Sequence, residues 1–125
     1  MLSKKYRLRK DFQFRYVYRN GQSVKNNAVT LFFVKAKNSG IKIGISVSNK
    51  IGKACVRNRA KRRIRECIRA NLNKMTKGYN YVFVAHNNFD FVETEYSTIL
   101  RYIEQAIQQA NAIINSSKPK SSSEV

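Results

Sequence analysis

Arginine and lysine side chains crowd one short stretch of this sequence, and their types and spacing suit the binding of phosphate groups. Positions 50–69 hold nine Lys or Arg residues and one acidic residue, Glu66. Within 54–72, arginine outnumbers lysine six to one, and a planar guanidinium can bind two phosphate oxygens at once. This concentration of like charge predicts contact with a polyanion.

The same stretch has the periodicity of an amphipathic helix over about 54–72. At 100° per residue, one face collects apolar residues and the opposite face collects polar and basic ones. The apolar stripe consists of Val56, Ala60, Ile64, Cys67 and Ile68. The polar face consists of Asn58, Lys61, Arg62, Arg65 and Arg69, with Arg57 and Arg59 flanking the stripe. We predict that the stripe packs on a sheet and that the polar face meets nucleic acid.

A basic helix face is more often simply solvated, but that alternative predicts a different arrangement of charge. A solvated helix mixes signs, because each Glu near a Lys or Arg adds a few tenths of a kcal/mol. Here like charges repeat, and basic residues at the helix start lie at the positive end of the helix dipole. A phosphate bound at that end would make the arrangement favourable. The charge pattern therefore favours nucleic-acid contact.

The whole chain is strongly basic and long enough for one modest domain. It has 125 residues, a formal net charge of +18 and 42% hydrophobic residues, so it can fold, and RNA, DNA or an anionic membrane could neutralise it. No apolar run reaches the length of a membrane span, and no secretory signal is present. Cys55 and Cys67 would lie roughly 18 Å apart along the helix, too far for a disulfide. We expect a cytoplasmic protein with no membrane partner.

The remaining pattern predicts a small α+β fold. The strand 41–48 alternates cleanly, with Ile41, Ile43 and Ile45 on one face. It should pair as a hairpin with strand 29–34 through a turn at 37–40, and it should form a β-α-β unit with the basic helix and strand 79–85. We therefore expect a small two-layer sandwich, a mixed sheet with packed helices, in the order α-β-β-(β)-α-β-α. Its parts would be a basic extended segment at 1–9, a helix at 11–18, the central unit, and an amphipathic helix ending near 114. Residues 1–114 would form a single RNA-binding domain, and 115–125 a disordered Ser- and Lys-rich tail.

The first helix contains more aromatic residues than it can bury. Phe12, Phe14, Tyr16 and Tyr18 are too many for one buried stripe. Some of them must therefore be exposed or line a cleft.

The residues needed for catalysis by the protein alone are missing. Residues 12–89 contain one carboxylate, Glu66, whereas metal-dependent phosphodiester cleavage needs several carboxylates around divalent ions. His86 is the only histidine, no Cys/His cluster has zinc spacing, and Gly52-Lys53 lacks the rest of a phosphate-binding loop. We expect that His86 is structural and that any associated chemistry belongs to another molecule.

Two segments carry a family resemblance. Residues 44–66 read GISVSNKIGKACVRNRAKRRIRE, and residues 14–21 read FRYVYRNG. Together they closely resemble the signature of the bacterial ribonuclease P protein subunit, an Arg-Asn-Arg core followed by Lys-Arg and preceded by an aromatic helix that ends in Gly. The likeness covers roughly residues 4–114.

The resemblance implies a function and a set of contacts. The family's protein binds a large catalytic RNA, one protein to one RNA. That RNA removes the 5′ leader of precursor tRNA, with Mg²⁺ held mainly by the RNA subunit and the substrate. The protein would thus be the non-catalytic subunit of an endoribonuclease. The implied contacts to ribonuclease P RNA are Lys50, Lys53, Arg57, Asn58, Arg59, Lys61, Arg62, Arg65 and Arg69.

The resemblance also places the leader in a cleft along the sheet, against Phe14, Tyr18 and Phe32. Aromatic side chains suit unpaired RNA, because bases stack on them. A shift of one residue in the strand would exchange Phe32 for Phe33. The family further implies a left-handed β-α-β crossover, against the usual right-handed rule.

Two other classes of nucleic-acid binder are compatible with the composition. A ribosomal protein or assembly factor would share the charge but has no need of an aromatic cleft. A DNA-binding architectural protein is disfavoured, because no dimer zipper or helix-turn-helix spacing is visible.

Overall fold

The computed structural model describes residues 6–8, 10–36 and 40–117, which form three α-helices and four strands. The expected turn at 37–40, the segment at 1–9 and the tail lie partly outside these ranges. The elements in chain order are α1 (Asp11–Asn20), β1 (Gln22–Lys25), β2 (Val29–Lys35), β3 (Ile41–Ser46), the 3-10 turn η2 (Asn49–Ile51), α2 (Ala54–Ala70), the 3-10 turn η3 (Leu72–Lys74), β4 (Tyr79–Ala85) and α3 (Tyr96–Ser117).

The four strands form one mixed sheet in the order β1-β2-β4-β3. β4 runs antiparallel to β2 and parallel to β3, so the expected β-α-β unit is confirmed. The expected hairpin between β2 and β3 is wrong, because β4 lies between them. The alternation of β3 predicts a strand with one buried face, and that pattern is equally compatible with either neighbour. The left hand of the crossover stays a prediction.

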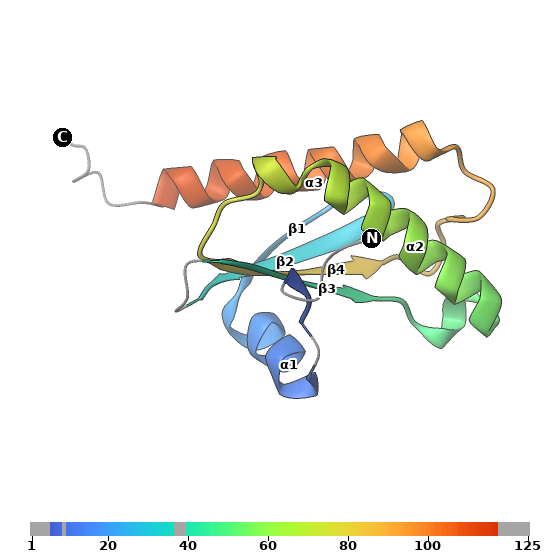
Figure 1. Ribbon diagram of the computed structural model, residues 1–125, viewed down its shortest axis with the longest axis horizontal. Coiled ribbons are helices and arrows are strands. Elements are labelled where there is room, and N and C mark those ends of the chain that lie inside the picture. Colours follow the sequence, from blue (N-terminus) through green and yellow to red (C-terminus); the bar gives the residue numbers. More distant parts are fainter. Residues whose placement is uncertain (1–5, 9, 37–39, 118–125) are drawn as a thin grey trace.

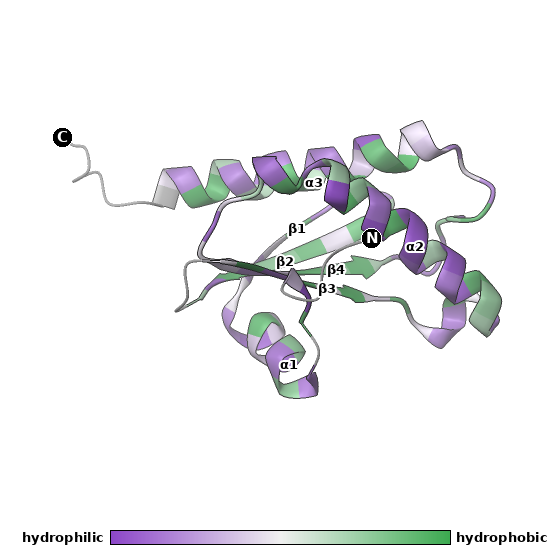
Figure 2. Ribbon diagram, viewed as in Figure 1, coloured by the Kyte–Doolittle hydropathy of each residue, from purple (hydrophilic) through white to green (hydrophobic). Residues whose placement is uncertain are grey.

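The sheet separates two helical layers (Figure 1). α2 and α3 cover one face and form with it the main sandwich, while α1 packs below the other face. On the α2/α3 side, cross-strand partners such as Phe33, Tyr81 and Ile43 share a row, and all three are at most 2% exposed. Figure 2 shows the corresponding hydrophobic strands between helices with hydrophilic outer faces.

The opposite face of the sheet receives α1. Val17 of α1 and Val82 of β4 are fully buried there. Gly44 pairs with Val82, and a Cβ at Gly44 would lie 2.5 Å from the Phe14 ring. The missing side chain therefore lets the Phe14 ring lie close against β3.

The boundaries differ from expectation at both ends of the chain. β1 is a four-residue, largely exposed edge strand with too few apolar residues to be predicted separately. α3 ends at Ser117, so the expectation of a disordered tail from Asn115 is wrong for residues 115–117. Helical hydrogen bonding continues there although the apolar stripe ends with Ile114, which is 1% exposed.

Candidate nucleic-acid interface

α2 is held by its apolar stripe, as the sequence predicts. Ala60, Ile64, Cys67 and Ile68 are fully buried, and Val56 is half-buried. Their burial fixes the direction of the opposite face, which contains Asn58, Arg62 and Arg69 as exposed residues and Lys61 and Arg65 as half-buried ones. A groove of about 540 Å³ runs along the helix, lined by Cys55, Val56, Asn58, Arg59, Lys61, Arg62, Arg65 and Val92.

The basic side chains of α2 form no ion pair within residues 6–8, 10–36 and 40–117. The ion pair found in those ranges joins Lys74 to Glu104, outside α2, with 4.0 Å between Nζ and Oε2. Burial, followed by the nearby charge of Arg7, lowers the pKa of Arg65. The helix face is therefore a cluster of uncompensated positive charge, which a phosphate would stabilise.

Two arginines of α2 have bonds within the protein. Arg57 Nη1 donates to the Gly52 carbonyl at 2.7 Å and thereby ties the helix to the preceding loop. Arg63 Nη1 donates to the Phe91 and Val92 carbonyls, both at 2.8 Å. Arg63, which the sequence did not single out, thus anchors the loop before α3. Its position beside the apolar stripe is the signal that could have indicated this.

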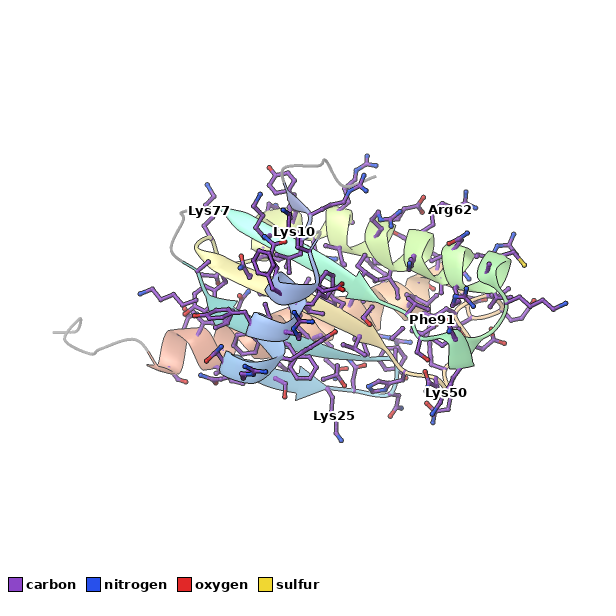
Figure 3. All side chains as sticks on the ribbon, turned by 90° about the horizontal axis from the view of Figure 1, so that it is seen from below. Lys10, Lys25, Lys50, Arg62, Lys77 and Phe91 are labelled. Atoms are coloured by element: carbon purple, nitrogen blue, oxygen red, sulfur yellow. The ribbon has the colours of Figure 1, made fainter. Side chains whose placement is uncertain are left out.

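The start of α2 is basic and uncapped. Lys53 is the N-cap residue, forms no side-chain cap and is followed by no acidic residue in the first turn. Lys50, in η2, and Lys53 are exposed, and Ser48 orders the turn by accepting a hydrogen bond from the Lys50 backbone N–H at 3.0 Å. Lys50 and Arg62 lie toward the same end of the molecule (Figure 3). The helix dipole adds to the positive potential at this end.

The three predicted cleft aromatics lie between α1 and the sheet. Phe32 shares its row with Val82 and Gly44, which places it on the α1 side, whereas Phe33 is buried in the main core. The Tyr18 and Phe32 rings meet edge-to-face with centroids 5.0 Å apart. Tyr18 remains 39% exposed, so the cluster still presents aromatic surface to solvent.

A cleft of about 420 Å³ joins this aromatic cluster to the basic helix. It is lined by Asp11, Phe14, Arg15, Tyr18, Ile45, Ser46, Val47 and Lys61. Lys61 also lines the α2 groove, so the two surfaces share a residue. The sequence did not predict this junction, because it depends on how β3 separates α1 from α2.

His86 lies on the cleft side of the sheet and is engaged in hydrogen bonds. Its Nδ1 lies 3.2 Å from the Asn27 carbonyl, so this nitrogen carries the proton. Its Nε2 is hydrogen-bonded to the Thr30 hydroxyl, with 2.7 Å between Nε2 and Oγ1. These bonds support the structural role expected for His86.

The described residues offer magnesium no ready set of protein ligands. Nowhere in 6–8, 10–36 and 40–117 do three His, Cys, Asp or Glu side chains lie together to hold a metal ion. Mg²⁺ commonly takes only one or two carboxylates and relies on phosphates and water for the rest.

No described helix is long and apolar enough to cross a membrane.

These features define a class: a small α+β protein with a basic helix face next to an aromatic cleft. The family model for ribonuclease P matches residues 2–111. The chain therefore belongs to the ribonuclease P protein family.

Relatives and solved structures agree with this assignment. A ribonuclease P protein component of Clostridium botulinum (strain Langeland) is 44% identical over 86 residues, covering 68% of this chain and 78% of the relative. The Clostridium beijerinckii component is 36% identical over 117 residues, covering 88% and 92%. The Thermotoga maritima RNase P protein structure superposes with a TM-score of 0.76 at 28% identity, covering 82% of this chain and 96% of that one. A Staphylococcus aureus RNase P protein structure gives 0.76 at 27%, covering 84% and 94%.

Proposed function

We propose that this chain is the protein subunit of a ribonucleoprotein endoribonuclease, which binds a catalytic RNA through α2 and the 5′ leader of precursor tRNA through the aromatic cleft. Family membership supports the RNA partner. The observation that carries the division of labour is the junction at Lys61, where an uncompensated basic face meets half-exposed aromatic rings.

The basic helix would bind the RNA subunit through phosphate contacts. Its contacts are Lys50, Lys53, Arg57, Asn58, Arg59, Lys61, Arg62, Arg65 and Arg69. Arg57 already uses one N–H on the Gly52 carbonyl, and its remaining N–H groups are the ones left for RNA. Binding releases counterions from the RNA, so it should weaken steeply with salt.

The cleft would select unpaired leader nucleotides. Phe14, Tyr18 and Phe32 offer ring surface on which bases stack, and a base-paired strand cannot use it. Arg15 and Lys61 border the same cleft and would bind the leader's phosphates. The protein would thus distinguish precursor from mature tRNA by the presence of a single strand.

Magnesium would be held by the RNA subunit and substrate, and the protein would raise its effective affinity by fixing the leader. Within the described part of the chain, no three His, Cys, Asp or Glu side chains lie together to hold the ion. In this proposal the RNA carries out the chemistry, with one protein per RNA in a cytoplasmic complex.

Reconstitution tests the proposal. Purified protein is mixed with a ribonuclease P RNA and precursor tRNA at low magnesium, and release of the 5′ leader is followed. We expect faster processing than with RNA alone. A ribosomal or assembly protein would bind RNA without this stimulation, so its absence would refute the proposed function.

A further inference from the structure

α1 carries a second aromatic pair on the side that the cleft does not use. Phe12 and Tyr16 are four residues apart, so they are neighbours on one flank of the helix. They are 59% and 53% exposed, more than any aromatic of the cleft. Phe14 and Tyr18, also four apart, occupy the other flank, with the sheet-facing Val17 between the two pairs.

This second flank borders a hollow of about 470 Å³. Its lining residues are Phe12, Gln13, Arg15, Tyr16, Arg19, Asn20 and Asn80. Arg15 and Arg19 are exposed, and neither takes part in an ion pair within the described residues. Arg15 also lines the leader cleft. The two arginines therefore form a basic ridge between two aromatic flanks.

Asn80 lines this hollow and has a buried amide oxygen that is not used as a hydrogen-bond acceptor within the described residues. It belongs to β4, where Val34 and Lys42 are its partners in the adjacent strands. Its Oδ1 is buried and has no hydrogen-bond partner among residues 6–8, 10–36 and 40–117. A buried acceptor without a donor is costly and uncommon in folded proteins. The oxygen is shielded from solvent in the free protein, so a ligand that brings an N–H or O–H donor into the hollow would remove that cost once the Asn80 amide turns toward it.

The composition of the hollow favours RNA over a protein partner. Exposed aromatic rings alone would suit either, but arginines that form no ion pair within the described residues, on a chain of net charge +18, attract phosphates. Aromatic rings beside arginines are the usual arrangement for binding single strands, since bases stack and phosphates pair.

We propose that Phe12, Tyr16, Arg15, Arg19 and Asn80 form a second single-stranded RNA site, which takes one or two nucleotides on the side of α1 opposite the leader cleft. Bases stack on the two rings, the arginines bind the flanking phosphates, and Asn80 Oδ1 accepts from a base amino group or a 2′-hydroxyl. This inference rests on the proposed function in one respect, which is that RNA is the ligand. The residues of the second site, apart from Arg15, lie outside the leader cleft.

The test follows each site separately by nuclear magnetic resonance. A hexanucleotide of adenosine is titrated into the full-length protein, and the ring resonances of α1 and the side-chain amide of Asn80 are monitored. We expect Phe12, Tyr16 and Asn80 to shift along one binding curve, and Phe14, Tyr18 and Phe32 along another. If only Phe14, Tyr18 and Phe32 fail to shift, the result counts against the leader cleft. If only Phe12, Tyr16 and Asn80 fail to shift, the result overturns the proposed second site.

Matched variants make the result specific. Phe12→Ala/Tyr16→Ala removes exposed rings and should leave the fold intact, while weakening the curve reported by Asn80 at least about fivefold. Phe14→Ala should instead weaken the cleft curve and spare Asn80. An Asn80 curve unchanged in the first variant would refute the site. Resonances of Phe12 and Tyr16 that shift with protein concentration without RNA would also refute it, because the rings would then join two copies of the chain.

Discussion

The basic face of α2 and the aromatic cleft of α1 differ in how they use the folded protein. On α2, the buried stripe carries the packing, and the charged side chains project from it and form no ion pair with any described residue. In the cleft, the rings pack and remain accessible at once, as in the edge-to-face contact of Tyr18 with Phe32. Positively charged side chains attract any phosphate over a distance, and this attraction weakens as the salt concentration rises. Aromatic rings bind only unpaired bases that stack directly on them. The comparison therefore predicts that changes in α2 weaken binding of the RNA subunit, whereas changes in the cleft weaken binding of the leader.

The largest effect is expected from Arg62→Ala/Arg65→Ala. Removing two charge-assisted contacts should weaken binding of the RNA subunit about 100-fold. The slope of log affinity against log salt should become shallower by about one per lost phosphate contact. Filter binding over a range of salt measures both. If binding is unchanged but the dependence on leader length is lost, the roles of helix and cleft are exchanged.

Phe14→Ala should produce the complementary loss. Stacking on one ring contributes about 1–3 kcal/mol, so the preference for precursor over mature tRNA should fall about tenfold. Affinity for the RNA subunit should be unaffected, because α2 is separated from Phe14 by β3. A parallel fall in both affinities would mean that α1 supports the helix interface instead of reading the leader.

Arg63→Ala provides the charge-matched control for Arg62. It removes the same charge from the same helix, but Arg63 bonds the Phe91 and Val92 carbonyls. We expect a loss of about 1–3 kcal/mol in the free energy of unfolding, measured by urea denaturation, with little change in RNA affinity. Arg62→Ala should show the reverse. Equal loss of RNA affinity in both variants would indicate a general charge effect.

The smallest effect concerns the buried side of α2. Burial raises the pKa of the Cys67 thiol to about 11, whereas an unfolded thiol ionises near 8.5. The unfolded state therefore loses this proton first as the pH rises, so the contribution is complete below about pH 8.5 and is lost progressively up to about pH 11. Urea denaturation at pH 8 and pH 10 should show a smaller pH-dependent loss of stability in Cys67→Ala than in the natural chain. An identical pH dependence would mean that Cys67 does not stay protonated in the fold.

The sequence predicted the individual helices and strands better than it predicted which strands pair with each other. The stripe from Ala60 to Ile68 and the alternation of Ile41 and Ile43 report local burial, and both are confirmed. The partner of β3 could not be predicted this way, because alternation says which face is buried and not which strand lies alongside.

The candidate site shows the same limit. The basic face follows from helix periodicity alone, whereas the choice between Phe32 and Phe33 required the register with β4. The sharing of Lys61 between groove and cleft, and the unused acceptor of Asn80, arise only when distant elements pack together. Neither has a signature in the local sequence.

The central claim is that α2 contacts the RNA subunit while the cleft contacts the leader, and directed cleavage of RNA tests it. Cys55 is exposed and Cys67 buried, so an iron chelate that generates hydroxyl radicals can be attached selectively at Cys55. A second protein, Cys55→Ser/Ser23→Cys, places the chelate on exposed β1 beside Phe32. In the complex with RNA subunit and precursor tRNA, we predict that the first chelate cleaves mainly the RNA subunit and the second mainly the leader. The opposite pattern, or cleavage of the same strand by both, would contradict the account.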